Sequence, residues 1–88
     1  MIAVKSVINK IRKSGLTISF AESCSGGNIA AEVIKISGVS DIFMGGVVTY
    51  SDEAKIDVLK LTKQDINKFG VVSENIAFLM AKNSKELF

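Results

Sequence analysis

Two short segments of the chain contain residue types that could do chemistry. The first, Ala21–Gly27, reads Ala-Glu-Ser-Cys-Ser-Gly-Gly, and the second, Tyr50–Lys55, reads Tyr-Ser-Asp-Glu-Ala-Lys. The sequence has no histidine, so a hydroxyl nucleophile would need a different general base. A partially buried lysine can take that role, because burial favours its neutral amine. A serine and a lysine, assisted by a tyrosine hydroxyl, are chemically sufficient for acyl transfer.

The residues of each segment also have alternative interpretations. Cys24 is a competing nucleophile, since a nearby helix N-terminus favours the thiolate, although a free cysteine is more often a small buried apolar residue. Glu22 could orient Lys55, cap a backbone N–H, or simply face solvent. Glycines before a helix could bind a phosphate or a developing oxyanion, but they also form ordinary tight turns. Tyr50 could end a strand and Lys55 could lie on a solvated helix face with no chemical role.

The two segments each follow a predicted strand. Residues 16–21 alternate in polarity, which predicts a strand with its Leu, Ile and Phe side chains toward the core. Residues 44–50 are mostly apolar without alternation, which is typical of a strand covered on both faces. Its glycines, Gly45 and Gly46, indicate a bulge or a close backbone approach. We expect Tyr50 to end this strand.

Helices are predicted on either side of these strands. Apolar spacing predicts a helix over 3–13, stopped by Gly15, and another between Gly27 and Gly38. Three short helical segments follow, capped by Ser51, Thr62 and Ser73, and the last of them runs to the end of the chain. The expected buried faces comprise Val4, Val7, Ile8 and Ile11 in the first helix, Ile29, Ala30, Val33 and Ile34 in the second, and Ile76, Leu79, Met80 and Leu87 in the last.

The order of these elements predicts a layered α/β domain. Ligands bind at the carboxyl ends of strands in open α/β sheets, so the two chemical segments should share one cleft there. Two strands are too few for a self-sufficient α/β core, and we therefore expect the chain to be the front portion of a larger domain. The apolar face that such a portion exposes favours association into a dimer or higher oligomer.

Composition excludes several classes of function. A chain of 88 residues forms one domain at most, and its single cysteine excludes a disulfide framework or a cysteine-cluster zinc site. A net charge of +2 and a single arginine argue against nucleic-acid or membrane binding. We expect a cytoplasmic protein, because neither a signal peptide nor a membrane-spanning run is evident. Phosphate-ester or phosphoanhydride chemistry is a weaker alternative, since no P-loop lysine follows Gly26-Gly27.

Three motifs taken together identify a family. Ala21–Gly27, Gly45–Lys55 and Gly70–Glu74, in this order and spacing, resemble the CinA C-terminal domain family of competence- and damage-inducible proteins. The resemblance spans nearly the whole chain. Active members of that family are amidohydrolases that convert nicotinamide mononucleotide (NMN) to nicotinic acid mononucleotide and ammonia. The resemblance implies a three-layer α/β/α fold with a mixed sheet, and an enzyme that needs no metal and no cofactor.

The family motif also implies roles for individual residues. Its serine falls on Ser23 as nucleophile, its lysine on Lys55 as general base, and its tyrosine on Tyr50, which would assist proton transfer or positioning. The remaining residues of the first motif are expected to contact the nucleotide substrate: Glu22, Cys24, Ser25, Gly26 and Gly27.

The chain departs from the family pattern in three ways. Ser25 replaces the usual threonine and keeps the hydroxyl, while Asp52 stands where asparagine is common and adds a negative charge. The family domain also continues for about as many residues again, with further strands that complete the sheet and the substrate pocket. We therefore expect residues 1–88 to form a partial domain with little or no activity of its own. The alternative is a non-catalytic module that binds a nucleotide or self-associates.

Overall fold

The computed structural model describes residues 2–88 and shows five α-helices, one 3-10 helix and two strands in that range. In chain order the elements are α1 (Ile2–Lys13), β1 (Ile18–Glu22), α2 (Asn28–Val33), the 3-10 helix η1 (Val39–Asp41), β2 (Phe43–Val48), α3 (Asp52–Leu59), α4 (Lys63–Phe69) and α5 (Glu74–Leu87). None of the helices in residues 2–88 is long and apolar enough to cross a membrane.

The two strands are parallel neighbours and carry a bulge. Ile18 pairs with Phe43 but Ser19 pairs with Gly45, so Met44 is the extra residue. Paired residues of parallel strands point to the same face of the sheet. The bulge therefore places Phe43 on the face of Phe20, while Gly45 and Val47 lie on the face of Ser19 and Ala21.

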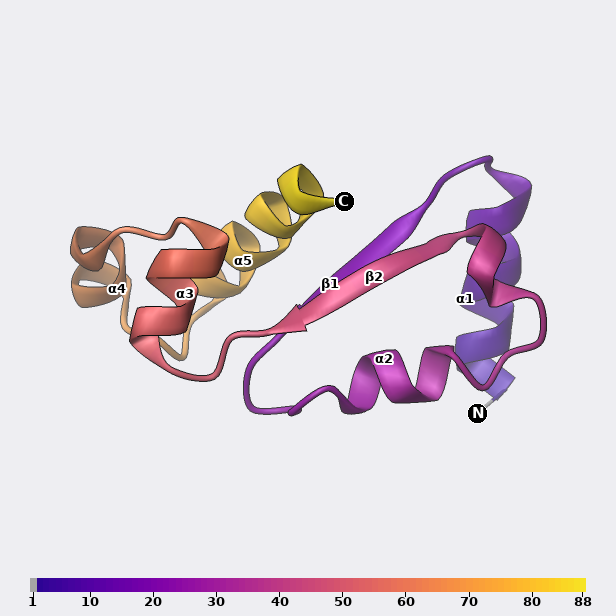
Figure 1. Ribbon diagram of the computed structural model, residues 1–88, viewed down its shortest axis with the longest axis horizontal. Coiled ribbons are helices and arrows are strands. Elements are labelled where there is room, and N and C mark those ends of the chain that lie inside the picture. The colour runs from indigo at the N-terminus through magenta and orange to yellow at the C-terminus, as the bar shows by residue number, and fades with distance from the viewer. Residues whose placement is uncertain (1) are drawn as a thin grey trace.

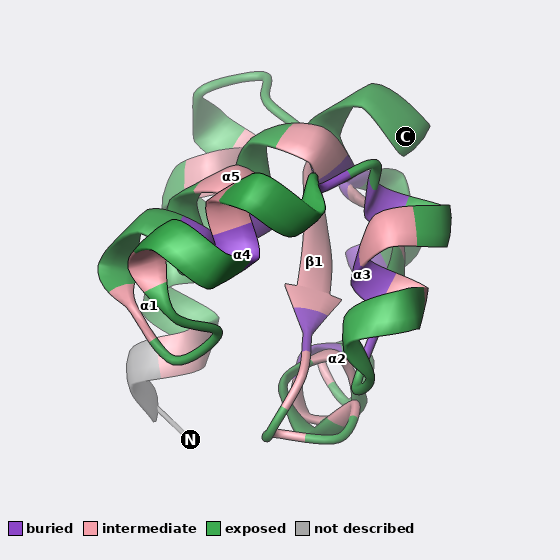
Figure 2. Ribbon diagram, turned by 90° about the vertical axis from the view of Figure 1, so that its left-hand side faces the viewer, coloured by how far each residue is buried: buried purple, intermediate pink, exposed green. Residues whose placement is uncertain are grey.

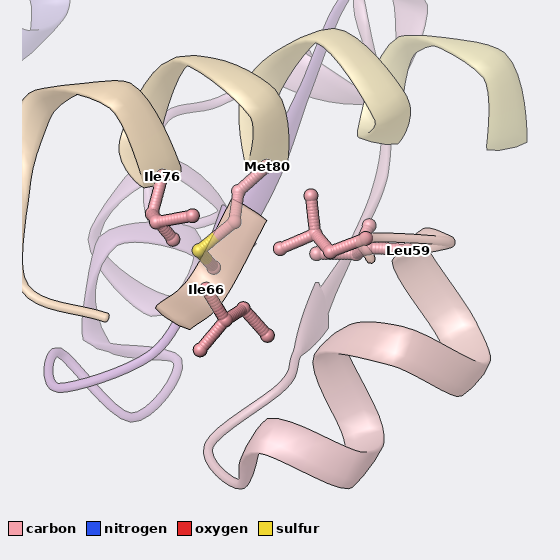
Figure 3. Close-up of a cluster of buried hydrophobic side chains, with 5 residues drawn as sticks. Leu59, Ile66, Ile76 and Met80 are labelled. Carbon is pink, nitrogen blue, oxygen red and sulfur yellow. The ribbon is translucent and has the colours of Figure 1, made fainter. Parts of the chain in front are cut away.

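Helices cover these two faces and produce an α/β/α arrangement. Figure 1 shows α1 and α2 at one end of the molecule and α3, α4 and α5 at the other, with the sheet running between them. On one face, Phe20 and Phe43 pack against an N-terminal cluster made of Ile8, Val33, Val39 and Ile42. On the other face, Ala21 and Val47 pack against a C-terminal cluster made of Leu59, Leu61, Ile66, Ile76 and Met80 (Figure 3). The layered α/β prediction is confirmed.

The glycines of β2 are required by close contacts. A Cβ on Gly45, whose φ is +147°, would lie 2.7 Å from the ring of Phe88. A Cβ on Gly46 would lie 3.0 Å from the carbonyl oxygen of Phe20. Both predicted features, the bulge and the close backbone approach, are therefore present.

Three helices begin where their capping residues predicted. The hydroxyl of Ser51 accepts a hydrogen bond from the N–H of Ala54, and Thr62 and Ser73 make the equivalent bonds to the helices that follow them. These bonds satisfy amide groups that have no partner within their own helix. α2 is different, because its N-cap is Gly27 and no side chain of that residue caps it. It also ends at Val33, well before Gly38, and η1 was not predicted.

Several predicted details were wrong at the edges of the sheet. β1 begins at Ile18, so Leu16 precedes the strand and is 61% exposed, and β2 ends at Val48, two residues before Tyr50. β2 is not covered on both faces, because Met44 and Val48 are each about half exposed, at 45% and 51%. Within residues 2–88, β2 pairs only with β1, so its other edge has no neighbouring strand.

The helical faces were predicted more accurately than the strand faces. Ile8, Ile76 and Met80 are buried as expected, and Figure 2 shows the buried positions on the inner sides of the helices. Val7 and Leu87 are exceptions, being 52% and 47% exposed. Ile29 and Ile34 are also exposed, because α2 is a short helix that directs only Val33 fully into the N-terminal cluster.

Candidate functional site

The two chemical segments meet at the carboxyl ends of β1 and β2, where they line one cleft. The cleft has a volume of about 480 Å³. Its wall is formed by Ala21, Glu22, Ser23, Cys24, Ser25, Tyr50, Asp52, Lys55, Val71, Val72, Ser73, Ala77 and Met80. Both segments therefore contribute to one cleft, as expected, whereas Gly26 and Gly27, which were expected to contact the substrate, are not among the residues that line it.

Lys55 is the most deeply buried group of this cleft. Its side chain is 1% exposed, and its Nζ donates hydrogen bonds to the carbonyl oxygens of Thr49 at 2.8 Å and Tyr50 at 2.9 Å. A third hydrogen bond joins Nζ to the Oγ of Ser23 at 3.1 Å. An ammonium group has three hydrogens and each of these has an acceptor here, which compensates for the burial of the charge.

Local structure explains why Lys55 reaches this position. Ser51 caps α3, so the helix starts at Asp52 and Lys55 lies in its first turn. Helical side chains lean toward the N-terminus of their helix, and here that direction leads back to the end of β2. The N–H of Thr49 donates to the carbonyl of Glu22 at 2.9 Å, which ties the end of β2 to the end of β1. The lysine is thus held by backbone groups that are themselves fixed.

Ser23 lies on a segment whose backbone is less constrained than the backbone around Lys55. It follows β1 directly and is half-buried, and its carbonyl accepts a hydrogen bond from the N–H of Gly26 at 3.0 Å. Gly26 and Gly27 both have positive φ angles, +62° and +94°, which side chains other than glycine rarely adopt. Cys24 is a free, exposed cysteine in the same loop. It is therefore not the buried apolar residue that a free cysteine usually is.

Glu22 anchors this loop from its buried position at the end of β1. Its two carboxylate oxygens accept the N–H groups of Ile29, at 2.9 Å, and Ala30, at 3.0 Å. Glu22 thus caps backbone groups, one of its predicted roles, and the α2 amides that it occupies are not free for a phosphate.

The pKa of Glu22 reflects the same contacts. Burial raises the pKa of this carboxyl, which is the largest single effect. The hydrogen bonds from the amides of Ala30 and Ile29, with smaller contributions from the nearby Ser25 hydroxyl and Gly27 amide, together lower it by more, so the pKa of Glu22 lies below its ordinary value. The carboxylate is therefore the stable form at neutral pH.

Tyr50 contributes to the site chiefly through its backbone. Its carbonyl accepts one of the Lys55 hydrogen bonds, whereas its side chain is 75% exposed at the cleft. Its hydroxyl has no hydrogen-bond partner among residues 2–88. The expected role in proton transfer or positioning stays a prediction.

Two parts of the site were missed when roles were assigned from sequence. Val71, Val72 and Ser73 line the cleft from the segment between α4 and α5. The motif Gly70–Glu74 was a signal for them, but it carried no assigned role. Thr49 is the second, since its carbonyl holds Lys55 and its own buried Oγ1 has no hydrogen-bond partner within residues 2–88. A contact made by a backbone carbonyl does not depend on the residue type, so no sequence motif could have identified Thr49.

Fold and site together define an α/β protein that pairs a serine with a buried lysine at the carboxyl ends of parallel strands. Comparison with protein families is more specific, because the CinA C-terminal domain family matches residues 2–88. The chain belongs to this family. A CinA-like protein of Kosmotoga olearia is 51% identical over 75 residues, which cover 85% of this chain and 18% of that protein. A CinA-like protein of Fervidobacterium nodosum is 50% identical, over 86% of this chain and 19% of that protein.

Solved structures agree with the family assignment. A competence/damage-inducible protein from Agrobacterium tumefaciens superposes with a TM-score of 0.87 at 36% identity, and a CinA superfamily protein from Escherichia coli with a TM-score of 0.91 at 27% identity. Each match covers 96% of this chain but only 51% and 49% of the respective structure. The chain thus spans about half of the solved structures and about a fifth of the curated relatives.

Proposed function

We propose that this chain carries the serine–lysine part of an amidohydrolase site of the NMN deamidase type. The observation that supports the proposal most is the 3.1 Å separation between Lys55 Nζ and Ser23 Oγ inside a cleft. Sequence resemblance supplies the substrate, since active members of this family hydrolyse the carboxamide of NMN. The substrate and the reaction both belong to the proposal.

The contacts of Lys55 suggest how the lysine acts as base. A neutral amine has two hydrogens and one lone pair. The charged form donates to the Ser23 hydroxyl as well. In the neutral form that a base requires, the two hydrogens satisfy the carbonyls of Thr49 and Tyr50, and the lone pair faces the hydroxyl of Ser23. Lys55 then accepts the Ser23 proton as Oγ bonds to the carboxamide carbon, and it returns that proton to the departing nitrogen.

The reaction balances in two stages. In the first, the C–N bond breaks, ammonia leaves, and the acyl group stays on Ser23 as an ester. In the second, water attacks the ester with Lys55 again accepting a proton, which releases the carboxylic acid and restores the hydroxyl. The amide N–H groups of Cys24 and Ser25 have no acceptor among residues 2–88 and follow the nucleophile directly, so they are candidate donors to the oxyanion.

A covalent-labelling experiment tests the proposal without requiring turnover. The purified chain is incubated with a fluorophosphonate, which phosphonylates activated serine hydroxyls, and the modified residue is mapped by mass spectrometry. We expect labelling at Ser23, and loss of that labelling in Ser23→Ala, while the matched control Ser6→Ala, at an exposed position of α1 outside the cleft, keeps it. Labelling at Ser25, or none above the background of exposed serines, would contradict Ser23 as nucleophile. Ammonia release from NMN is measured in parallel and is expected to be low for this chain alone.

A second candidate function is a non-catalytic module that self-associates. It is favoured by the unpaired outer edge of β2 and by the exposed apolar side chains Met44, Val48 and Phe88 along this part of the molecule. Such a surface is favourable to bury against another copy of the chain. Sedimentation of the purified chain is expected to give a dimer or larger species, and a stable monomer at high concentration would contradict this.

A further inference from the structure

The buried carboxylate of Glu22 has no place in the proton transfer from Ser23 to Lys55. It is nevertheless 4% exposed and immediately precedes Ser23 in the chain. Burying a charge costs free energy unless hydrogen-bond partners compensate for it. The fixed hydrogen-bond partners of Glu22 therefore indicate that this carboxylate has a structural role.

Those contacts join three parts of the site. The side chain of Glu22 binds the amides of Ile29 and Ala30 in the first turn of α2. Its backbone carbonyl accepts the N–H of Thr49, whose own carbonyl holds Lys55 Nζ. One residue thus fixes α2 on one side and the backbone that carries the base on the other.

The segment between these anchors needs such an external constraint. Ser23 to Gly27 contains two glycines with positive φ, and the N-cap position of α2 makes no side-chain hydrogen bond of its own. Glycine leaves the backbone with many accessible conformations. Without Glu22, the hydroxyl of Ser23 would sample positions away from Lys55 Nζ.

We propose that Glu22 is a positioning residue, whose carboxylate holds the Ser23–Gly27 loop against α2 so that the Ser23 hydroxyl stays in contact with Lys55. This inference rests on the proposed function, because it assigns a purpose to the Ser23–Lys55 contact. A displacement of about 1 Å between reacting groups can cost on the order of 100-fold in rate, so a modest loosening of the loop should be measurable.

Two measurements on the full 88-residue chain test this role. Hydrogen–deuterium exchange measures the mobility of residues 23–30, and fluorophosphonate labelling measures the reactivity of Ser23. The variant Glu22→Gln keeps the size of the side chain but leaves one oxygen to accept two amides. Glu74→Gln is the matched control, since Glu74 is exposed at the start of α5 and the same charge is removed.

We expect Glu22→Gln to speed exchange in residues 23–30 and to lower Ser23 labelling of the folded chain about 10- to 100-fold, while Glu74→Gln leaves both unchanged. Glu22→Asp, one methylene shorter, should show smaller changes in the same direction, and it is the deciding variant if Glu22→Gln does not fold. Unchanged exchange overturns the proposal, and so does faster exchange with unchanged labelling per folded molecule. If the unmodified chain labels no faster than Lys55→Met, the Ser–Lys function fails, and the exchange result alone then decides whether Glu22 holds the loop.

Discussion

The two loops that carry Ser23 and Lys55 are held in place by different kinds of contact. The loop after β2 leads into a helix capped by Ser51, and it places Lys55 among two backbone carbonyls and one hydroxyl. The loop after β1 contains two glycines with positive φ angles and leads into the six-residue helix α2. The first-turn amides of α2 are capped by the side chain of Glu22, which lies at the end of β1. The base is thus held by two backbone carbonyls and a hydroxyl, whereas the loop that carries the nucleophile is held by the carboxylate of a single residue. The serine loop should therefore be the more sensitive to a change at Glu22, and the lysine side to removal of Lys55 itself.

The largest expected effect comes from removing the base. Lys55→Met should lower both Ser23 labelling and any amide hydrolysis by about 10²- to 10⁴-fold, because general-base catalysis is worth about that much. Binding of the nucleotide should change little, since the loss falls on the transition state. Lys82→Met, on an exposed position of α5, is the control for charge. An equal loss of binding and reactivity would instead make Lys55 an anchor for the substrate phosphate.

A substitution in the serine loop should come next in size. Gly27→Ala places a Cβ at a φ of +94°, 3.4 Å from Cγ2 of Val48. The left-handed conformation costs a residue with a Cβ about 1–2 kcal/mol, which should appear as a lower free energy of unfolding in urea and as slower Ser23 labelling. A variant as stable and as reactive as the unmodified chain would show that the backbone of this loop is not restrictive.

Removing the cap of the lysine helix gives a smaller change. Ser51→Ala deletes the hydrogen bond to the N–H of Ala54 and should lower the free energy of unfolding by about 1 kcal/mol. Ser23 labelling of the folded chain should be nearly unchanged, because Lys55 is held by carbonyls rather than by this cap. A large loss of labelling without a matching loss of stability would contradict the view that the base is fixed by several independent contacts.

The smallest effect concerns pH. The folded-state pKa of Glu22 lies below its ordinary value, so this carboxyl adds stability above the unfolded-state pKa, and that stability is lost as the pH falls through the folded-state value. The unmodified chain should therefore exceed Glu22→Gln in free energy of unfolding at neutral pH, with a difference that shrinks under acidic conditions. Asp41 and Glu32 also have lowered pKa values, through Arg12 and Lys35 respectively. The unmodified chain and Glu22→Gln both keep these two groups, so their contribution cancels in the difference between the two chains. A constant difference across pH would contradict a charge-based role for Glu22.

The sequence by itself determined the features that depend on neighbouring residues. The caps at Ser51, Thr62 and Ser73 were predictable, because each hydroxyl binds an amide only three residues ahead. The two glycines of β2 indicated a bulge or a close backbone approach, and the order of the elements placed both motifs after strands. The family followed from three motifs in one arrangement.

Only the tertiary structure decided which groups meet. Ser23 and Lys55 are 32 positions apart, and it is the parallel pairing of β1 with β2 that brings them within hydrogen-bond distance. The partners of Glu22 remained open among three alternatives until the position of α2 was known. The exposure of Met44 and Val48 was mispredicted, because the sequence of an apolar strand does not show whether other elements cover it. Burial depends on elements from elsewhere in the chain that pack against the strand.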